Sequence, residues 1–314
     1  MFAAFPFRVG QTAFAGMLIM AAGSLTVPAV DVISKLLMER LPTAQVGAFR
    51  LLAQSLLLVP LVLLAGQMRR PHPLQIAGGG LLAFAIFSLN AALREMPVAN
   101  AIAIFFVQPL ILTVMAGVLL REGIGWRRIL AVLVGLVGAI VVLRPNVGAY
   151  GWVAVWPLVA AFFFSSYMIV SRIMSRRGGH LAHVMWTGAT ATVLLGALGA
   201  GIAAAGASDA AFLMPTWREA WLFLAAAVIG IFVTSCFMAA LSRADAAAVA
   251  PLTYLEIVGA TGLGWLVFGD FPDAMTWAGT AIIVGAGIYV IHRERVLARR
   301  ALVGTREGAA RVRR

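Results

Sequence analysis

The chain has 314 residues, of which 62% are hydrophobic and only 11% are charged, and its formal net charge is +12. Its mean hydropathy is +0.98. Soluble chains are about one-quarter charged, so this composition excludes a soluble globule and indicates a lipid bilayer as the surrounding medium. The basic residues are almost all arginines that lie between or after apolar runs, which is a membrane-orientation pattern, and no nucleic-acid partner is expected.

Apolar runs follow one another along the chain, each close to the length of about 20 residues that a helix needs to cross a bilayer. The runs are continuously apolar, which argues against the alternating strands of a membrane β-barrel. We therefore predict an all-α integral membrane protein. Its ten transmembrane helices are expected at roughly 13–37, 43–66, 74–94, 97–120, 125–143, 151–174, 182–206, 219–242, 246–268 and 273–292.

The distribution of arginine predicts the orientation. With the N-terminus inside, the inner connections and the C-terminal tail hold 18 arginines and the outer connections hold 4. This bias predicts a multi-pass protein of the bacterial inner membrane with both termini cytoplasmic. Residues 1–12 form the cytoplasmic N-terminus in this scheme, and residues 293–314 form a basic cytoplasmic tail. The tail is interpreted as a solvated anchor, with a lipid- or RNA-binding arm as the alternative.

The two halves of the chain, 13–143 and 151–292, resemble each other at an offset of 148 residues. Five spans is an odd number, so the second copy enters the membrane from the opposite face. The sequence thus predicts a 5+5 inverted repeat with a binding site near the midplane; chance similarity between two Ala/Leu-rich segments is the alternative. The matched positions include Ala92-Leu93 with Ala240-Leu241, Phe106 with Tyr254, Gln108 with Glu256, and Glu122 with Asp270.

Several local features resemble one superfamily. An acidic residue closes the fourth span of each copy (Glu122 and Asp270), a Gly-containing span follows, and Arg144-Pro145 comes after span 5. With the stretch Asp31-x-x-Ser34-Lys35, these features resemble the drug/metabolite transporter superfamily of the EamA type over nearly the whole chain. The resemblance implies a ten-helix transporter. Activities in that superfamily include uptake of riboflavin and S-adenosylmethionine and export of amino acids and metallophores, so the resemblance does not select a substrate.

Four charged residues lie within the predicted spans, where ionisable groups are costly and therefore functional candidates. Asp31 and Lys35 are four residues apart on one helix face, and Arg50 falls at a depth comparable to that of Asp31. Glu256 lies near the centre of the ninth span. Asp31 and Glu256 are the candidates for proton coupling. Structural alternatives are a salt bridge between the first two spans and, for Glu256, an interhelical hydrogen bond.

Polar and aromatic residues at similar depths complete the predicted substrate site. Pro28 precedes Asp31 by about one helical turn and Pro109 follows Gln108, so kinks are expected beside the polar residues. For any single aromatic residue, packing is the alternative. The predicted substrate-binding set is Asp31, Lys35, Arg50, Asn90, Asn100, Phe105, Gln108, Thr253, Tyr254 and Glu256.

The sequence lacks a phosphate-binding loop, a hydrolase arrangement, and a spacing of Cys or His that suits a metal, so no enzyme activity, cofactor or metal site is expected. We predict a secondary transporter for a small organic metabolite, an amino-acid-like, zwitterionic or ring-bearing solute, coupled to protons or to exchange. A membrane enzyme acting on lipid and a non-transporting sensor or scaffold are the alternatives. Because one chain holds both copies, a monomer is sufficient and a homodimer is possible.

Overall fold

A computed structural model describes residues 6–119, 126–175, 179–206, 212–241, 243, 250–286, 288–289 and 292, and every regular element in these ranges is helical. The prediction of an all-α chain is thereby confirmed for the described residues. The elements are α1 (Pro6–Met38), α2 (Thr43–Leu64), α3 (Pro73–Glu95), α4 (Val98–Phe105), α5 (Gln108–Leu119), α6 (Trp126–Tyr150), η1 (Gly151–Val155), α7 (Trp156–Ser175), α8 (His180–Ala204), α9 (Trp217–Leu241), η3 (Ala250–Tyr254) and α11 (Leu255–Phe268). A further apolar helix covers Ala274–Ala286.

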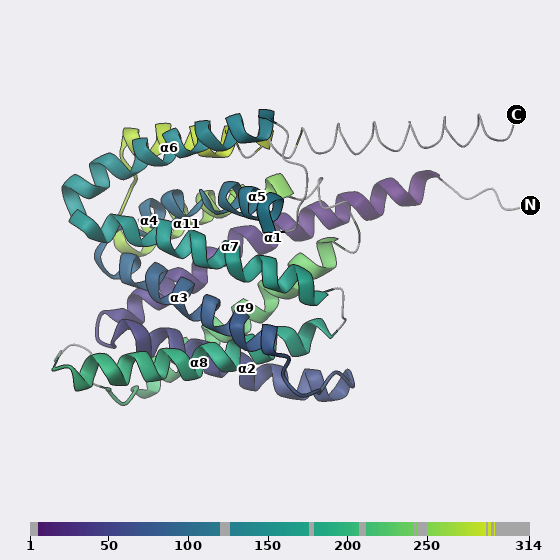
Figure 1. Ribbon diagram of the computed structural model, residues 1–314, viewed down its shortest axis with the longest axis vertical. Coiled ribbons are helices and arrows are strands. Elements are labelled where there is room, and N and C mark those ends of the chain that lie inside the picture. The colour runs from purple at the N-terminus through teal and green to yellow at the C-terminus, as the bar shows by residue number, and fades with distance from the viewer. Residues whose placement is uncertain are drawn as a thin grey trace, which may run out of the picture.

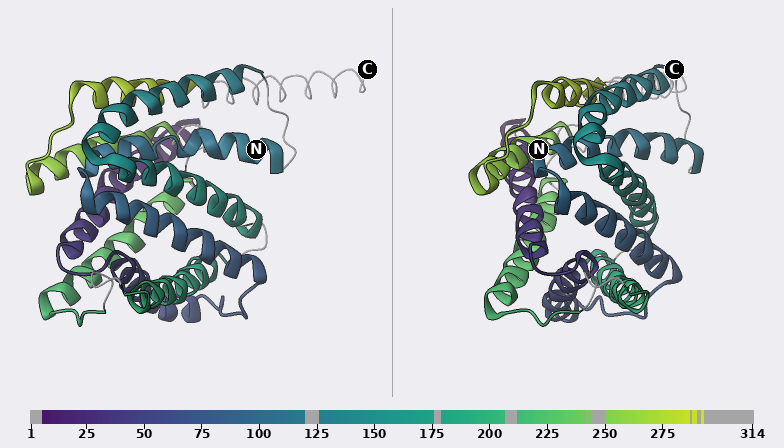
Figure 2. Two further views of the ribbon diagram at one scale, coloured as in Figure 1. Left: turned by 60° about the vertical axis from the view of Figure 1, so that its left-hand side comes forward. Right: turned by 90° about the vertical axis from the view of Figure 1, so that its left-hand side faces the viewer.

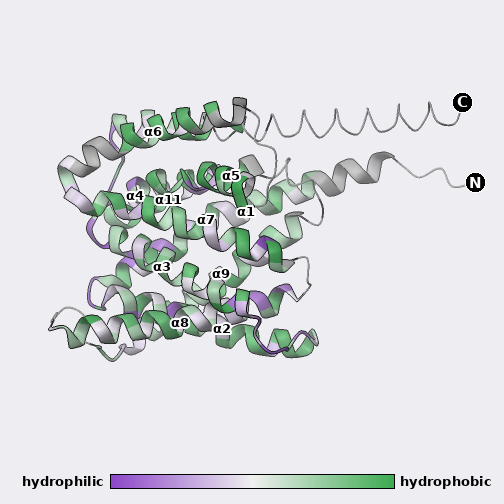
Figure 3. Ribbon diagram, viewed as in Figure 1, coloured by the Kyte–Doolittle hydropathy of each residue, from purple (hydrophilic) through white to green (hydrophobic). Residues whose placement is uncertain are grey.

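Seven helical segments in the described ranges, of 22 to 27 residues, are long and apolar enough to cross a membrane. The three other predicted spans contain shorter apolar helices, Leu133–Val142, Leu252–Phe268 and Ala274–Ala286. Apolar residues cover most of the helical ribbon (Figure 3), and many face outward; the side chain of Leu64, for example, is 86% exposed. An outer surface of this kind suits lipid. Ten membrane crossings remain a prediction.

The ends of α2 and α3 follow from local sequence. Gly66 adopts a φ of 63°, which favours glycine. The N–H of Gly66 donates to the carbonyl of Leu63, and that of Gln67 donates to Val62, so α2 ends in a Schellman motif. Helix α3 begins at Pro73, whose missing N–H costs nothing in the first turn, and its N-cap His72 forms a capping box with Gln75.

Two predicted spans are interrupted rather than continuous. The predicted span 97–120 consists of α4 and α5, which are separated at residues 106–107. Pro109 explains this break, because its ring has no N–H and collides with the carbonyl four residues earlier in a regular helix. The predicted span 246–268 begins, in its described part, with the 3-10 turn η3, which contains Pro251, before α11 starts. The sequence predicted kinks at prolines, but not the full interruption.

Helices of the first half pack mainly on helices of the second half. Helix α1 contacts α9 and α11, α2 contacts α8, α3 contacts α7 and α8, and α4 contacts α11. The α2–α8 pair runs along one edge of the molecule in Figure 1 and in both views of Figure 2. The largest buried cluster lies among α1, α3, α4 and α11 and includes Leu37, Ile102, Tyr254 and Ile257. This arrangement brings polar residues that are far apart in sequence into one region.

Helix α6 and the helix Ala274–Ala286 lie side by side at the opposite edge (Figure 1). A methyl group added at Gly138 would lie 2.9 Å from the carbonyl oxygen of Gly279, and one added at Gly279 would lie 2.7 Å from the carbonyl oxygen of Gly138. Only glycine permits such a backbone approach, which is typical of helix contacts in membranes.

Candidate functional site

The site is built around a close contact between α1 and α11. A methyl group added at Gly259 would lie 2.6 Å from the carbonyl oxygen of Leu25 and 3.2 Å from Cγ of Pro28, so the two helices touch where one has no side chain. Asp31 lies three residues after Pro28, and Glu256 lies three residues before Gly259. Each carboxyl group therefore lies about one helical turn from this contact, and the two interact electrostatically.

Three of the four charged residues predicted within spans interact there. The carboxylate of Asp31 interacts electrostatically with the guanidinium of Arg50 on α2 and with the carboxyl of Glu256 on α11. Asp31 is 6% exposed, and the other two are partly buried. No salt bridge shorter than 4 Å joins these described residues, and Nε of Arg50 is buried without a hydrogen-bond partner. We call Asp31, Arg50 and Glu256 the charged trio.

Buried polar atoms without a hydrogen-bond partner also occur on α1, α3 and η3, elements that carry or contact the helices of the trio. They include the Oγ of Ser24, the Nδ2 of Asn90 and the hydroxyl of Tyr254. Ser24 lies seven residues before Asp31 on the same face of α1. Asn90 Nδ2 would be 3.5 Å from a methyl group added at Gly47, one turn before Arg50. A buried polar atom that makes no hydrogen bond costs roughly 1–3 kcal/mol, so these atoms are suited to bind water or a solute.

Two repeat-matched positions in the broken spans lie in contact. The rings of Phe106, just after α4, and Tyr254, the last residue of η3, have centroids 5.3 Å apart and planes tilted by 38°. Next to the break, the carbonyl of Gln108, the first residue of α5, accepts a hydrogen bond of 3.0 Å from Ser165 Oγ on α7. Interrupted helices whose backbone groups are satisfied by neighbours are typical of transporter binding sites.

The structure places the remaining predicted residues less uniformly. Asn100 is buried in α4, and Thr253 lies in η3 next to Tyr254. The ring of Phe105 packs against Phe164 of α7, with centroids 5.7 Å apart, rather than against Tyr254. Gln108 is partly buried, and no contact joins its side chain to Glu256. Phe105 therefore follows the packing alternative.

Lys35 pairs with a partner that the sequence did not indicate. Its Nζ lies 3.5 Å from Oδ2 of Asp270 and donates a hydrogen bond of 2.9 Å to the carbonyl of Met96. The same Nζ lies 4.7 Å from the ring centroid of Phe268, a cation–π distance. Lys35 thus fastens the end of α1 to the α3–α4 junction and to the end of α11. The expectation that Lys35 shares the site of Asp31 is not supported by these contacts.

A second fastening lies beside it. Arg40 donates from Nε to Oε1 of Glu219 (2.8 Å) and from Nη2 to Oε2 (3.0 Å), a bidentate pair, and Nη2 also donates to the carbonyl of Met214 (2.7 Å). Gln45 on α2 both donates to and accepts from the backbone of Leu213. These contacts tie the α1–α2 turn to the start of α9.

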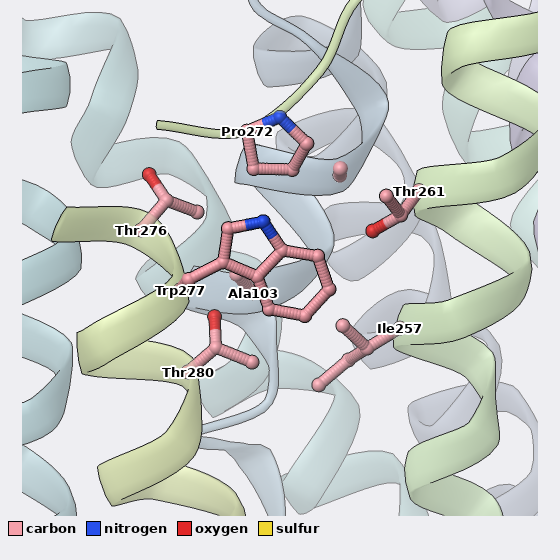
Figure 4. A pocket seen from close by; sticks show the side chains of 8 residues that line it. Ala103, Ile257, Thr261, Pro272, Thr276, Trp277 and Thr280 are labelled. Carbon is pink, nitrogen blue, oxygen red and sulfur yellow. The ribbon is translucent and has the colours of Figure 1, made fainter. Parts of the chain in front are cut away.

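A crevice between α4, α11 and the helix Ala274–Ala286 carries hydroxyl groups but has almost no free volume (≈ 0 Å³). Figure 4 shows the indole of Trp277 lying across it, between Thr276 and Thr280 on one side and Thr261 and Ile257 on the other. The hydroxyls of Thr261 and Thr276 are buried without a hydrogen-bond partner. As it stands, the crevice has no space for a solute.

Comparison with known proteins places the chain among membrane transporters. The profile of the EamA-like transporter family matches residues 14–144 and, a second time, residues 151–292. The S-adenosylmethionine uptake transporter of Rickettsia bellii is 29% identical over 268 residues, which cover 84% of this chain and 89% of that protein. The riboflavin transporter of Vibrio cholerae is 30% identical over 215 residues, covering 68% of each chain. A pseudopaline exporter of Pseudomonas aeruginosa is 28% identical over 277 residues, which cover 87% of this chain and 94% of that protein.

A solved crystal structure shares the fold. It superposes with a TM-score of 0.59 at 22% sequence identity and covers 91% of this chain and 99% of its own. The helical arrangement described above is therefore a known one, and it extends over nearly the full length of both chains.

Proposed function

The chain belongs to the EamA-like transporter family, and we propose that it moves a small organic solute across the bacterial inner membrane by alternating access. The solute binds beside the charged trio, where α1, α2 and α11 meet. The observation that carries this proposal is that three charged side chains within predicted spans interact there, Asp31 buried and Arg50 and Glu256 partly buried. Helices at the same junction also hold buried polar atoms that lack hydrogen-bond partners.

The charge of the trio favours a solute with a positive group. With both carboxyl groups ionised, Asp31 and Glu256 carry two negative charges against one on Arg50, and the site lacks one positive charge. A cationic group of the solute, or a proton, supplies it. An uncompensated charge in a membrane interior is costly, so binding of either is favourable. A zwitterionic or amino-acid-like solute fits this pattern, with its anionic group near Arg50 and any ring against Tyr254 and Phe106.

Helix pairing supports the 5+5 inverted repeat of residues 13–143 and 151–292. Exchanging the two copies replaces α1 by α7, α2 by α8, and α3 by α9. The contact between α1 and α9 then becomes the contact between α7 and α3, and both are present. The contact of α2 with α8 exchanges into itself, and it too is present. Such pairing is what a twofold relation between the copies requires.

The fastenings at the end of α1 act as a gate in this proposal. The Lys35–Asp270 and Arg40–Glu219 pairs join the two copies on the side that the arginine distribution assigns to the outside. Opening that side requires both pairs to separate. Lys35 is then a closing contact, and Asp31, four residues earlier, is the solute contact. The structure corresponds to a state that is closed on this side.

Flux into proteoliposomes tests the proposal, with S-adenosylmethionine, riboflavin and amino acids as the first solutes. Asp31→Asn and Glu256→Gln are expected to reduce flux of the accepted solute by more than tenfold or to abolish its dependence on pH. Glu95→Gln, which removes an exposed carboxyl group in α3, is the matched control and is expected to transport normally. The proposed site is refuted if the two trio variants retain the flux and pH dependence of the control.

A further inference from the structure

A cavity of about 340 Å³ lies at the other end of the helices, where the α2–α3 loop meets α7 and α8. Gly66, Gln67, Arg69 and Arg70 line it from the loop, and Trp186 lines it from α8. None of the residues that line this cavity belongs to the charged trio. Nothing in the transport proposal uses it.

The walls of this cavity are held in place by hydrogen bonds. The Schellman motif at Gly66 turns the chain so that Gln67 Oε1 accepts a hydrogen bond of 3.1 Å from the N–H of Leu181. Trp186 Nε1 donates to the carbonyl of Arg69 at 2.9 Å. The His72–Gln75 capping box closes the loop at the start of α3. A cavity whose walls are fixed before binding loses little entropy when a ligand enters.

The cavity is electropositive. Arg69 and Arg70 are exposed, and neither guanidinium makes a hydrogen bond or ion pair within the part of the chain that the structure describes. The residues that line the cavity include no acidic side chain. The N-terminal ends of α3 and α8 also lie at its walls, at His72 and Gly179, and they contribute partial positive charge. Unpaired arginines with this support suit a phosphate group, which they bind in bidentate fashion.

The side chains around the cavity indicate that the phosphate group belongs to a lipid. Leu63, Leu64 and Met68, in the last turn of α2 and the loop, are exposed apolar side chains close in sequence to the loop residues that line the cavity. We call these three side chains the Leu63–Met68 rim; exposed apolar groups of this kind suit acyl chains rather than water. The arginine distribution assigns this end of the helices to the cytoplasmic side. On that side, basic pockets between transmembrane helices bind the headgroups of anionic lipids.

We propose that this cavity binds the phosphodiester headgroup of an anionic phospholipid, with Arg69 and Arg70 as the phosphate ligands and the Leu63–Met68 rim against the acyl chains. The proposal does not rest on the transported solute. It assigns to the α2–α3 loop a lipid-binding role in addition to joining two helices.

Native mass spectrometry of the detergent-purified full chain tests it. Dioleoyl phosphatidylglycerol is expected to remain bound more strongly than dioleoyl phosphatidylcholine. Arg69→Gln and Arg70→Gln are each expected to weaken phosphatidylglycerol binding about fivefold, and Arg70→Lys less. Arg243→Gln, which removes an exposed arginine at the same end of the helices, is the matched control and is expected to leave binding unchanged.

Three outcomes overturn the proposal. Equal retention of the two lipids removes the role of the headgroup charge. A loss in Arg243→Gln equal to that in Arg69→Gln and Arg70→Gln shows that net charge, not the cavity, attracts the lipid. Displacement of phosphatidylglycerol by millimolar inorganic phosphate, with phosphate alone protecting the protein from thermal unfolding, assigns the cavity to a free anion. Each outcome is read without a flux measurement, so it is independent of the proposed transport.

Discussion

Replacing Gly259 by alanine perturbs the α1–α11 contact that positions Asp31 and Glu256. The added methyl group would lie 2.6 Å from the carbonyl oxygen of Leu25 and 3.2 Å from Cγ of Pro28. The carbonyl belongs to the backbone of α1, and Pro28 is rigid, so neither can move aside as a flexible side chain would. We expect α1 and α11 to separate locally, and the distance between the two carboxyl groups to change.

The magnitude follows from two opposing effects. Overpacking of a tight contact costs about 1–3 kcal/mol, whereas replacing glycine by alanine inside a helix gains up to about 1 kcal/mol. The net expectation for Gly259→Ala is a loss of about 1–2 kcal/mol. Gly262→Ala on the same helix is the matched control, because a methyl group there meets nothing within 4 Å. Gly262→Ala gains only the higher helix propensity of alanine. The change in the free energy of unfolding should therefore be opposite in sign for the two variants.

Thermal unfolding in detergent, followed by the fluorescence of the eight tryptophans, measures the difference. At roughly 2–4 °C per kcal/mol, Gly259→Ala should unfold several degrees below the wild type and Gly262→Ala at or above it. Solute flux should fall in Gly259→Ala and stay normal in Gly262→Ala. The reasoning is refuted if Gly259→Ala is as stable and as active as Gly262→Ala, because the two helices would then not touch at Gly259.

Three further tests probe other contacts. A double-mutant cycle with Lys35→Gln and Asp270→Asn should give a coupling of about 1 kcal/mol or less in thermal stability, together with a change in flux; additive effects would show that the pair does not fasten α1. Gly66→Ala forces a side chain into a φ of 63° and should cost about 1 kcal/mol, whereas Gly201→Ala, which meets nothing within 4 Å in α8, should not; equal stabilities would contradict the Schellman turn. Pro109→Ala should leave stability equal or higher and lower the flux, since it allows α4 and α5 to join; unchanged flux would show that the break is dispensable.

The sequence singled out each member of the charged trio separately, because each is costly in lipid; their role in solute binding stays a prediction. A carboxylate or guanidinium within an apolar run stands out without any structure, and Asp31, Arg50 and Glu256 were all identified on that basis. The depth comparison of Asp31 with Arg50 needed only the helical rise per residue. The electrostatic interaction between Asp31 and Glu256 was not predicted, because it depends on how α1 and α11 pack.

The sequence failed where a partner lies far along the chain. Asp270, the partner of Lys35, is 235 residues away, and nothing in local spacing relates them. Asp270 appeared only as the acid that closes a predicted span. Ser24 was missed because a serine in an apolar helix is common, although its spacing of seven residues from Asp31 was a usable signal. Phe105 was assigned to the site because an aromatic ring in a broken span does not reveal whether it faces a cavity or a neighbouring helix.

The packing of each half on the other has a consequence for how the chain enters the membrane during synthesis. The main neighbours of α1 are α9 and α11. Both are synthesised long after α1, so α1 enters the bilayer before these neighbours exist. Asp31 must nevertheless be inserted at once. Arg50 follows within the next helix, whereas Glu256 emerges about 225 residues after Asp31. Arg50 is therefore the countercharge that lets the first helix remain in the bilayer until its neighbours arrive.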